Sequence, residues 1–196
     1  MNIIRKDSLN TTTWSGGTTT ELRIMPEDGV YSERRFDFRV STATVEAGES
    51  TFTSLPGVQR HLMILEGIIN LRHQGMEPAV LNVFEQDTFD GGVMTQSMSE
   101  VPVVDFNLML KPPFKGRLVH HACVAETVIS ALGNIDEDQA VYRDIYCAKG
   151  PVEIVVGNHS VRLFTGDYLQ LQGREICTEI QVNNHGDLIE VNVWSE

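Results

Sequence analysis

The sequence predicts an all-β fold with two barrel-like halves in one chain. Short runs of residues alternate between apolar and polar side chains with a period of two, and glycine, proline and asparagine interrupt the runs. Such alternation is typical of strands that bury one face. No stretch shows a capped apolar stripe with a period of 3.6 residues. The strongest helical candidate, CVAETVISAL, is rich in β-branched residues and is equally compatible with an extended conformation.

Four runs in the first half of the chain have strand patterns: FDFRVSTATV, HLMILEG, IINLRH and VVDFNLML. The second and third are predicted to pair as a hairpin around Gly67. In VVDFNLML, Asp105 and Asn107 fall on one face of the strand, and Phe106 and Leu108 fall on the other.

The second half continues with the same pattern. PVEIVVGNHSVRLFTGDYLQL predicts a strand, a turn at Gly157 and Asn158, a second strand, and a turn at Gly166 and Asp167 before a third strand. EICTEIQVNNHGDLIEVNVW then supplies two further strands at the end of the sequence.

This repeated order of strands and turns predicts a duplicated small barrel. Pro112 and Pro113 lie between the two halves, where paired prolines cannot continue a ladder of hydrogen bonds. We therefore expect a first barrel over residues 1–112, which carries the candidate pocket, and a second barrel over residues 113–196. The two halves share a pattern and not residues.

The composition excludes several classes of partner. The chain has 196 residues, with 27 acidic residues against 15 lysines and arginines, and its formal net charge is −12. That charge repels nucleic acids and anionic membrane surfaces, so neither is expected as a partner. No apolar run approaches a signal-peptide core or a membrane span. The three cysteines are odd in number and form no C-x-x-C pair, which favours reduced thiols and a cytoplasmic location.

Several segments together resemble one protein family. The run WSGGTTTE, from Trp14 to Glu21, is similar to the signature W-x-N-G-G-G-x-T-x-E of the HutD/Ves family. FDFRVSTATVEAGESTFTSLPGVQRHLMILEG resembles the segments d-F-x-W-R-x-S-x-A-x-V, G-x-F-S-x-F-P-G-v-x-R and L-L-E-G of that family. DFNLML resembles its D-F-N-L-M. The resemblance covers residues 14–110 in the family's order, and the second half matches mainly in its strand pattern.

The resemblance implies a cupin-type fold (an RmlC-like jelly roll) with two barrels, that is, a bicupin. It also implies a cytoplasmic bacterial protein associated with histidine utilisation or stress response, with formylglutamate-like acids as candidate ligands. Three positions depart from the family pattern. Ser15 stands where the family has asparagine, which affects any ligand contact made by that amide, Thr18 stands where the family has a third glycine, and Phe38 replaces a tryptophan.

The histidines do not have the spacing of a metal site. A cupin metal centre requires His-x-His, a nearby glutamate and a third histidine from a later strand. His61 has no such partner, and adjacent strand residues such as Arg60 and His61 point to opposite faces. The pair His120 and His121 fails as a chelate for the same reason. We therefore expect neither a metal nor another cofactor.

Two arginines point to anion binding. Arg39 shares a strand face with Ser41, and Arg60 shares a face with Leu62 and Ile64. A buried arginine requires a carboxylate, either from the protein or from a ligand, and its planar guanidinium group suits that acceptor. The predicted pocket comprises Trp14, Gly16, Gly17, Arg39, Ser41, Arg60, Asp105 and Asn107. The structural alternative is an internal ion pair between Arg39 and Asp105, with Arg60 at the barrel rim.

The sequence thus predicts a metal-free bicupin that binds a small anionic ligand and acts as a sensor or regulator. No catalytic residue is assigned, and a homodimer is left open. One alternative is a metal-independent isomerase, lyase or hydrolase that acts on a small acid and uses Glu66, Asp105 or His61 as its acid or base. The other is a protein-interaction module with a vestigial pocket. A cupin fold alone would not separate these functions.

Overall fold

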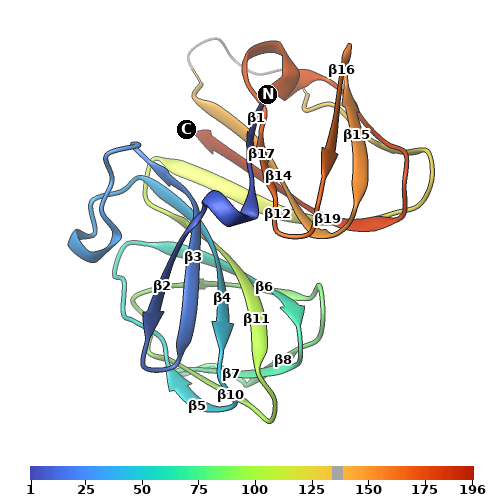
Figure 1. The fold of residues 1–196 in the computed structure, drawn as a ribbon. Helices are drawn as coiled ribbons and strands as arrows, with labels where there is room; N and C mark the ends of the chain where they lie inside the picture. The colour runs from blue at the N-terminus through green and yellow to red at the C-terminus, as the bar shows by residue number, and fades with distance from the viewer. Residues whose placement is uncertain (134–138) are drawn as a thin grey trace. The chain divides into compact units, whose positions relative to one another are not determined.

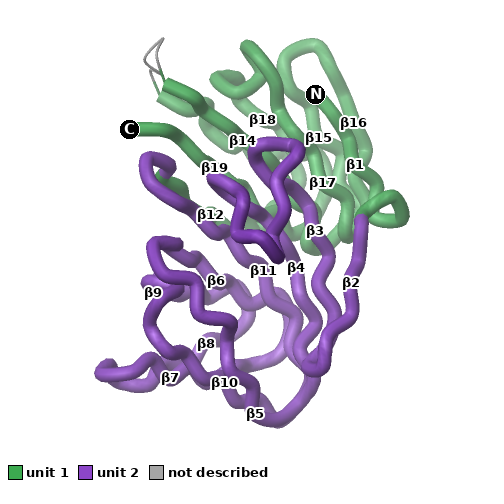
Figure 2. Tube along the Cα trace, turned by 90° about the vertical axis from the view of Figure 1, so that its left-hand side faces the viewer, with its two compact units in different colours: residues 1–9, 115–196 green, residues 10–114 purple. Residues whose placement is uncertain are grey.

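The computed structural model describes residues 1–133 and 139–196, and within them the chain is almost entirely β-structure (Figure 1). The chain forms two compact units. Unit 2 contains residues 10–114, and unit 1 contains residues 1–9 and 115–196 (Figure 2). The all-β prediction is confirmed, and each unit contains two sheets.

Unit 2 consists of a six-stranded and a four-stranded antiparallel sheet. The six-stranded sheet has, in spatial order, the strands β2 (Asn10–Trp14), β3 (Gly17–Met25), β4 (Phe38–Val45), β11 (Val103–Leu110), β6 (Gln59–Glu66) and β9 (Gln86–Asp90). The four-stranded sheet has the strands β5 (Gly48–Thr51), β10 (Thr95–Ser99), β7 (Ile69–His73) and β8 (Ala79–Leu81). A short 3-10 helix, η2 (Tyr31–Glu33), lies in the connection between β3 and β4.

The two sheets of unit 2 pack face to face. Leu62 and Ile64 of β6 contact Ile69 and Leu71 of β7 in one buried apolar cluster. Burial of this apolar surface is the main force that holds the sheets together. The inner face of the six-stranded sheet therefore lies against the second sheet, and the candidate arginines lie on that inner face.

Unit 1 is also built from two antiparallel sheets. The first has the strands β1 (Asn2–Ile4), β17 (Tyr168–Gln170), β14 (Val141–Lys149), β19 (Gly186–Ser195) and β12 (Phe114–Cys123). The second has the strands β13 (Thr127–Ile129), β18 (Ile180–Val182), β15 (Val152–Val156) and β16 (His159–Leu163). Two 3-10 helices, η1 (Lys6–Ser8) and η3 (Gly173–Cys177), complete the unit. Its core joins both sheets, as Ile145, Leu169 and Leu188 of the first pack with Ile154 and Val182 of the second.

Most strand predictions are confirmed, but one predicted hairpin is wrong. The hairpin around Gly157 and Asn158 forms between β15 and β16. The run HLMILEG falls in β6, which pairs with β11 and β9, whereas IINLRH falls in β7, which pairs with β10 and β8. Gly67 has a φ of 85° and lies at the point where the chain passes from one sheet to the other. Residues 62–64 of β6 are all buried, so the alternation that distinguishes a simple hairpin is absent.

The ends of the two units differ in detail from the predicted boundary at residues 112 and 113. Strand β11 ends at Leu110 and β12 begins at Phe114, on either side of the two prolines. Residues 1–9 belong to unit 1, where β1 pairs with β17 and the amino group of Met1 contacts the carboxylate of Glu175.

No helix in the described part of the chain has the length and apolar composition needed to cross a membrane.

Candidate functional site

A line of side chains that includes two arginines, the arginine row, crosses the inner face of the six-stranded sheet in unit 2. Met109 of β11 lies directly opposite Arg39 of β4 on one side and Arg60 of β6 on the other. Arg60 in turn lies opposite Phe89 of β9. Because side chains alternate along a strand, the residues two positions away point to the same face. Asn107 therefore accompanies this row.

Arg39 is neutralised within the protein. Its Nε donates a hydrogen bond to the carboxylate of Glu21 at 2.7 Å, and its Nη1 donates to the hydroxyl of Ser41 at 3.1 Å. The guanidinium carbon lies 4.3 Å from the centre of the Tyr31 ring. The structure thus does not form the ion pair between Arg39 and Asp105 that the sequence offered as an alternative.

Arg60 has a different environment. The side chain is buried, with only 6% of the residue exposed, and its Nη2 donates a hydrogen bond to Oδ1 of Asn107 at 2.7 Å. Its Nε is buried and has no hydrogen-bond partner among the described residues. The rings of Phe52 and Phe89 lie 4.7 and 5.3 Å from the guanidinium carbon, which provides cation–π stabilisation but no acceptor for the remaining N–H groups. The guanidinium group of Arg60 thus keeps a buried N–H group without an acceptor among the described residues.

Asp105 is the carboxylate that completes this network. Nδ2 of Asn107 donates a hydrogen bond to Oδ1 of Asp105 at 2.6 Å, so the three side chains form the Arg60–Asn107–Asp105 chain. Burial raises the pKa of Asp105 to about 6, although the charge of Arg60 and hydrogen bonds from Asn107 and the backbone of Ala43 oppose the rise. Burial also lowers the pKa of Arg60, and the charge of Asp105 offsets part of that effect. The site therefore joins a buried cation to a carboxylate that exchanges its proton near neutral pH.

The structure brings five of the eight predicted pocket residues together: Arg39, Ser41, Arg60, Asp105 and Asn107. The other three do not lie beside the arginines. Gly17 is opposite Val45, six positions along β4 from Arg39, or about 20 Å at the usual rise per strand residue.

Trp14 and its glycines instead form a tight hairpin between β2 and β3. Nε1 of Trp14 donates a hydrogen bond to the hydroxyl of Thr19, and the indole ring covers the position that a Cβ on Gly16 would occupy. Gly17 has a φ of 148°, and a Cβ there would lie 1.8 Å from the carbonyl oxygen of Thr44. A side chain at Gly16 would thus displace the indole ring of Trp14, and one at Gly17 would clash with the backbone of β4.

Sequence reasoning missed four residues that surround the arginines: Glu21, Tyr31, Phe52 and Phe89. Glu21 is the last residue of the WSGGTTTE motif, and that position was the only signal for it. Its approach to Arg39 depends on a register shift between Glu21 and Arg23 in β3. Tyr31 and Phe52 lie outside the strands of the row, so strand periodicity could not identify them.

The histidines of unit 2 do not gather around a metal-binding position. His61 lies opposite Leu108 and Thr88, on the face of β6 that is opposite to Arg60, and its Nδ1 is 2.8 Å from the hydroxyl of Thr88. No group of three or more histidine, cysteine, aspartate or glutamate side chains with the geometry of a metal site occurs within residues 1–133 and 139–196.

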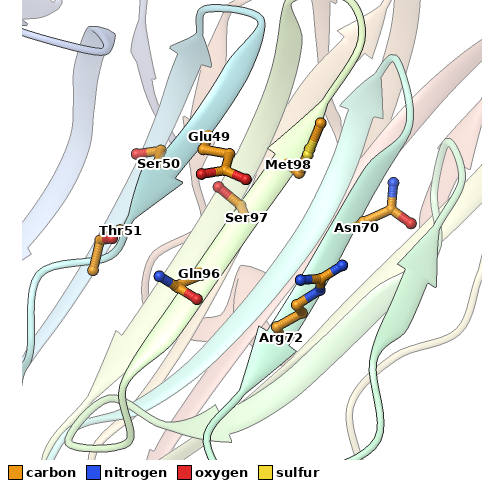
Figure 3. A pocket seen from close by; sticks show the side chains of 8 residues that line it. All are labelled: Glu49, Ser50, Thr51, Asn70, Arg72, Gln96, Ser97 and Met98. Carbon is orange, nitrogen blue, oxygen red and sulfur yellow. The ribbon is translucent and has the colours of Figure 1, made fainter.

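A hollow lies on the outer face of the four-stranded sheet of unit 2. It has a volume of about 260 Å³ and is lined by Glu49, Ser50, Thr51, Asn70, Arg72, Gln96, Ser97 and Met98. Figure 3 shows these side chains on three neighbouring strands, β5, β10 and β7. The hollow is open, its lining is mostly polar, and it shares no residue with the arginine row. It is thus separate from the Arg60–Asn107–Asp105 chain.

Unit 1 also buries an arginine among acceptors. Nε of Arg143 donates to the carboxylate of Glu190 at 2.6 Å, and Nε2 of His121 lies 2.9 Å from the other oxygen of Glu190. The remaining nitrogens of Arg143 donate to the backbone carbonyl groups of Ser130, Ile176 and Thr178. Burial alone would raise the pKa of Glu190, but the hydrogen bond from His121 and the charge of Arg143 outweigh it and lower that pKa.

Comparisons with known proteins place this geometry in context. The family model described as HutD matches residues 6–189. Among solved structures, a conserved protein of unknown function from Pseudomonas aeruginosa PAO1 has a TM-score of 0.81 and 23% identity, over 98% of this chain and 97% of the other. HutD from Pseudomonas fluorescens SBW25 has a TM-score of 0.73 and 23% identity, over 97% of each chain.

More distant structures share the fold at lower identity. A bacterial pirin from Escherichia coli in complex with nickel(II) has a TM-score of 0.71 and 11% identity, over 97% of each chain. No curated protein sequence gives a significant match. At these identities the structural likenesses show the cupin-type fold and carry no statement about activity.

Proposed function

This chain belongs to the HutD family, and from that premise we propose that unit 2 binds a small carboxylic acid at Arg60 without a metal. We further propose that the protein acts in the cytoplasm as a sensor or regulator of histidine utilisation or of stress response. The ligand assignment is supported by the site itself, whereas the biological role is supported by the family alone.

One observation carries the ligand assignment. Arg60 is buried, its protein acceptor is the neutral amide of Asn107, and its Nε has no partner among the described residues. Leaving a charged donor buried without an acceptor is costly, and a carboxylate is the acceptor whose planar geometry best matches a guanidinium group. A ligand carboxylate at Nε would satisfy the donor that the protein leaves open.

The apolar surroundings of Arg60 favour a small acid. Phe52 and Phe89 flank the guanidinium group of Arg60, and Leu62 and Ile64 lie on the same inner face. A formyl or short acyl group suits such walls, in agreement with a formylglutamate-like ligand. The structure of HutD from Pseudomonas fluorescens was obtained in a formate condition, which makes formate a natural first probe.

A thermal-shift assay tests the assignment with formate, acetate and N-formyl-L-glutamate. An acid present at about a hundred times its dissociation constant should raise the free energy of unfolding by about 2.7 kcal/mol. Arg60→Met should abolish the shift, and it is expected to fold because Asp105, once it loses this cation, can take up a proton and remain buried as a neutral group. Arg72→Met, on the outer face of the other sheet, is the matched control and should respond like the wild type.

The assignment fails if no acid shifts the wild type, or if Arg60→Met responds as the wild type does.

A second candidate function is a metal-independent enzyme, which the raised pKa of Asp105 favours because such a carboxyl group can act as a general acid or base. Product analysis after incubation with N-formyl-L-glutamate separates the two: release of formate would indicate an enzyme, and recovery of intact ligand would indicate a binding protein.

A further inference from the structure

The two arginines on the inner face of unit 2 are balanced by two carboxylates before any ligand enters. Arg39 and Arg60 supply two positive charges, and Glu21 and ionised Asp105 supply two negative charges, whereas the third carboxylate on this face, Asp87, is bonded to His73. A ligand carboxylate at Arg60 would add a third negative charge in a buried environment. An uncompensated buried charge is strongly unfavourable, so the site must lose one negative charge when the ligand binds.

Asp105 is the group in the best position to lose that charge. Glu21 is paired directly with Arg39 at 2.7 Å, whereas Asp105 reaches Arg60 only through the amide of Asn107. A ligand on Arg60 would thus lie close to Asp105 and would compete with it for the same cation. When two carboxylates share one cation in a buried site, protonation of the more weakly held carboxylate is favoured.

The other titratable groups near Arg60 have partners of their own. From β7, His73 contacts the hydroxyl of Thr95 through Nδ1 and the carboxylate of Asp87 through Nε2, at 2.9 and 2.8 Å. From the connection between β3 and β4, Tyr31 stacks on Arg39. On β10, the buried side chains are Thr95, Ser97 and Ser99, which carry no charge.

We propose that a carboxylate ligand enters unit 2 together with one proton, and that Asp105 takes up this proton and so determines the charge that the site accepts. The inference rests on the proposed function and adds the form of the ligand to it, since the site gains the equivalent of a neutral acid. In the step, a solvent proton adds to the Asp105 carboxylate, the ligand remains an anion on Arg60, and no bond of the ligand breaks. Asn107 still donates to the carbonyl oxygen of protonated Asp105.

This coupling fixes the direction of the pH dependence. The pKa of Asp105 is raised to about 6 in the free protein, so at pH 7 the group is mostly ionised. A bound carboxylate raises that pKa further. The affinity should then be nearly constant below about pH 6 and should fall by up to tenfold for each pH unit above it, as one proton is taken up per ligand.

Isothermal titration calorimetry tests the coupling with sodium formate and, in parallel, N-formyl-L-glutamate. Titrations at pH 7.0 in HEPES and in Tris should differ in binding heat by the ionisation heat of nearly one proton. Asp105→Asn mimics the protonated group, so its binding heat should be the same in both buffers and its affinity should not change between pH 6 and 8. Glu77→Gln removes an exposed carboxylate between β7 and β8 and should behave like the wild type.

Each outcome has one meaning. Binding to the wild type without proton uptake overturns the coupling and leaves the proposed ligand site intact. Proton uptake that persists in Asp105→Asn overturns the role of Asp105. Absence of any binding by the wild type overturns the proposed function, and the coupling with it. The wild-type heats decide the first question even if the variant does not fold.

Discussion

Arg60 of unit 2 and Arg143 of unit 1 occupy corresponding positions in their sheets. Arg60 lies near the start of β6, which pairs with β11, the last strand of unit 2 along the chain. Arg143 lies near the start of β14, which pairs with β19, the last strand of unit 1 along the chain. Arg60 lies opposite Met109 and bonds to Asn107, two positions earlier in β11. Arg143 lies opposite Asn192 and bonds to Glu190, likewise two positions earlier in β19.

The two arginines differ in their acceptors. Arg143 is fully buried and has a carboxylate and three backbone carbonyl groups, so the protein satisfies its charge and its donors. Arg60 has one amide oxygen and two aromatic rings, and its Nε has no partner within the described residues. The two corresponding positions thus differ: Arg143 lies in an ion pair that the protein completes, whereas Arg60 keeps an Nε without an acceptor, and this is the observation behind the proposed ligand site.

The largest expected effect comes from making unit 1 resemble unit 2. Glu190→Gln keeps the shape of the side chain but leaves Arg143 with an amide, as Arg60 has. Removal of one partner of a buried ion pair leaves the other charge uncompensated, so the free energy of unfolding should fall by roughly 3 kcal/mol. Urea denaturation monitored by circular dichroism measures the change.

Glu153→Gln is the control for this change, because Glu153 lies on an exposed position of β15 and its substitution should alter stability by less than about 0.5 kcal/mol. If Glu190→Gln is no more destabilising than Glu153→Gln, the carboxylate does not hold Arg143. The contrast between the two units would then rest on the backbone carbonyl groups alone.

The strand patterns identified the arginine row but not its partners. Arg39, Ser41 and Asn107 were predicted because each alternates with apolar residues along its own strand. This alternation depends only on local spacing. Glu21 was missed as a partner because its approach depends on which strand pairs with β4 and on a register shift in β3. Local spacing carries no information about either.

The correspondence between Arg60 and Arg143 was equally hidden. Arg60 and Arg143 have different neighbours in sequence, QRHLMILE against VYRDIYCAK, and only the pairing registers show that they correspond. The change of sheet at Gly67 was missed for a related reason, since β6 is buried on both faces and gives no sign of which sheet it joins. Long-range pairing, rather than strand propensity, is the part of this fold that the sequence does not reveal.

The reverse change makes unit 2 resemble unit 1. Asn107→Asp gives Arg60 a direct carboxylate in place of the amide, so the cation is neutralised by the protein and a ligand anion is repelled. The ligand-dependent stabilisation of about 2.7 kcal/mol at a hundredfold excess over the dissociation constant should then be lost in a thermal-shift assay with formate. Asn70→Asp, on the outer face of the neighbouring sheet, is the matched control and should retain the shift. An undiminished shift in Asn107→Asp would show that the acid does not bind to the unpaired N–H group of Arg60.

The smallest effect concerns the residue directly opposite each arginine. Met109 fills this position in unit 2, whereas in unit 1 it is Asn192, which is 2% exposed and whose side-chain nitrogen and oxygen have no hydrogen-bond partner in the described part of the chain. Asn192→Leu removes both unsatisfied groups at similar volume, so the free energy of unfolding should rise by about 1 kcal/mol in urea denaturation. Asn192→Ala removes the same groups but leaves a cavity, and should therefore give no gain. If Asn192→Leu is instead destabilising, the amide has a partner such as a buried water molecule. The surroundings of Arg143 would then contain a polar group in addition to Glu190.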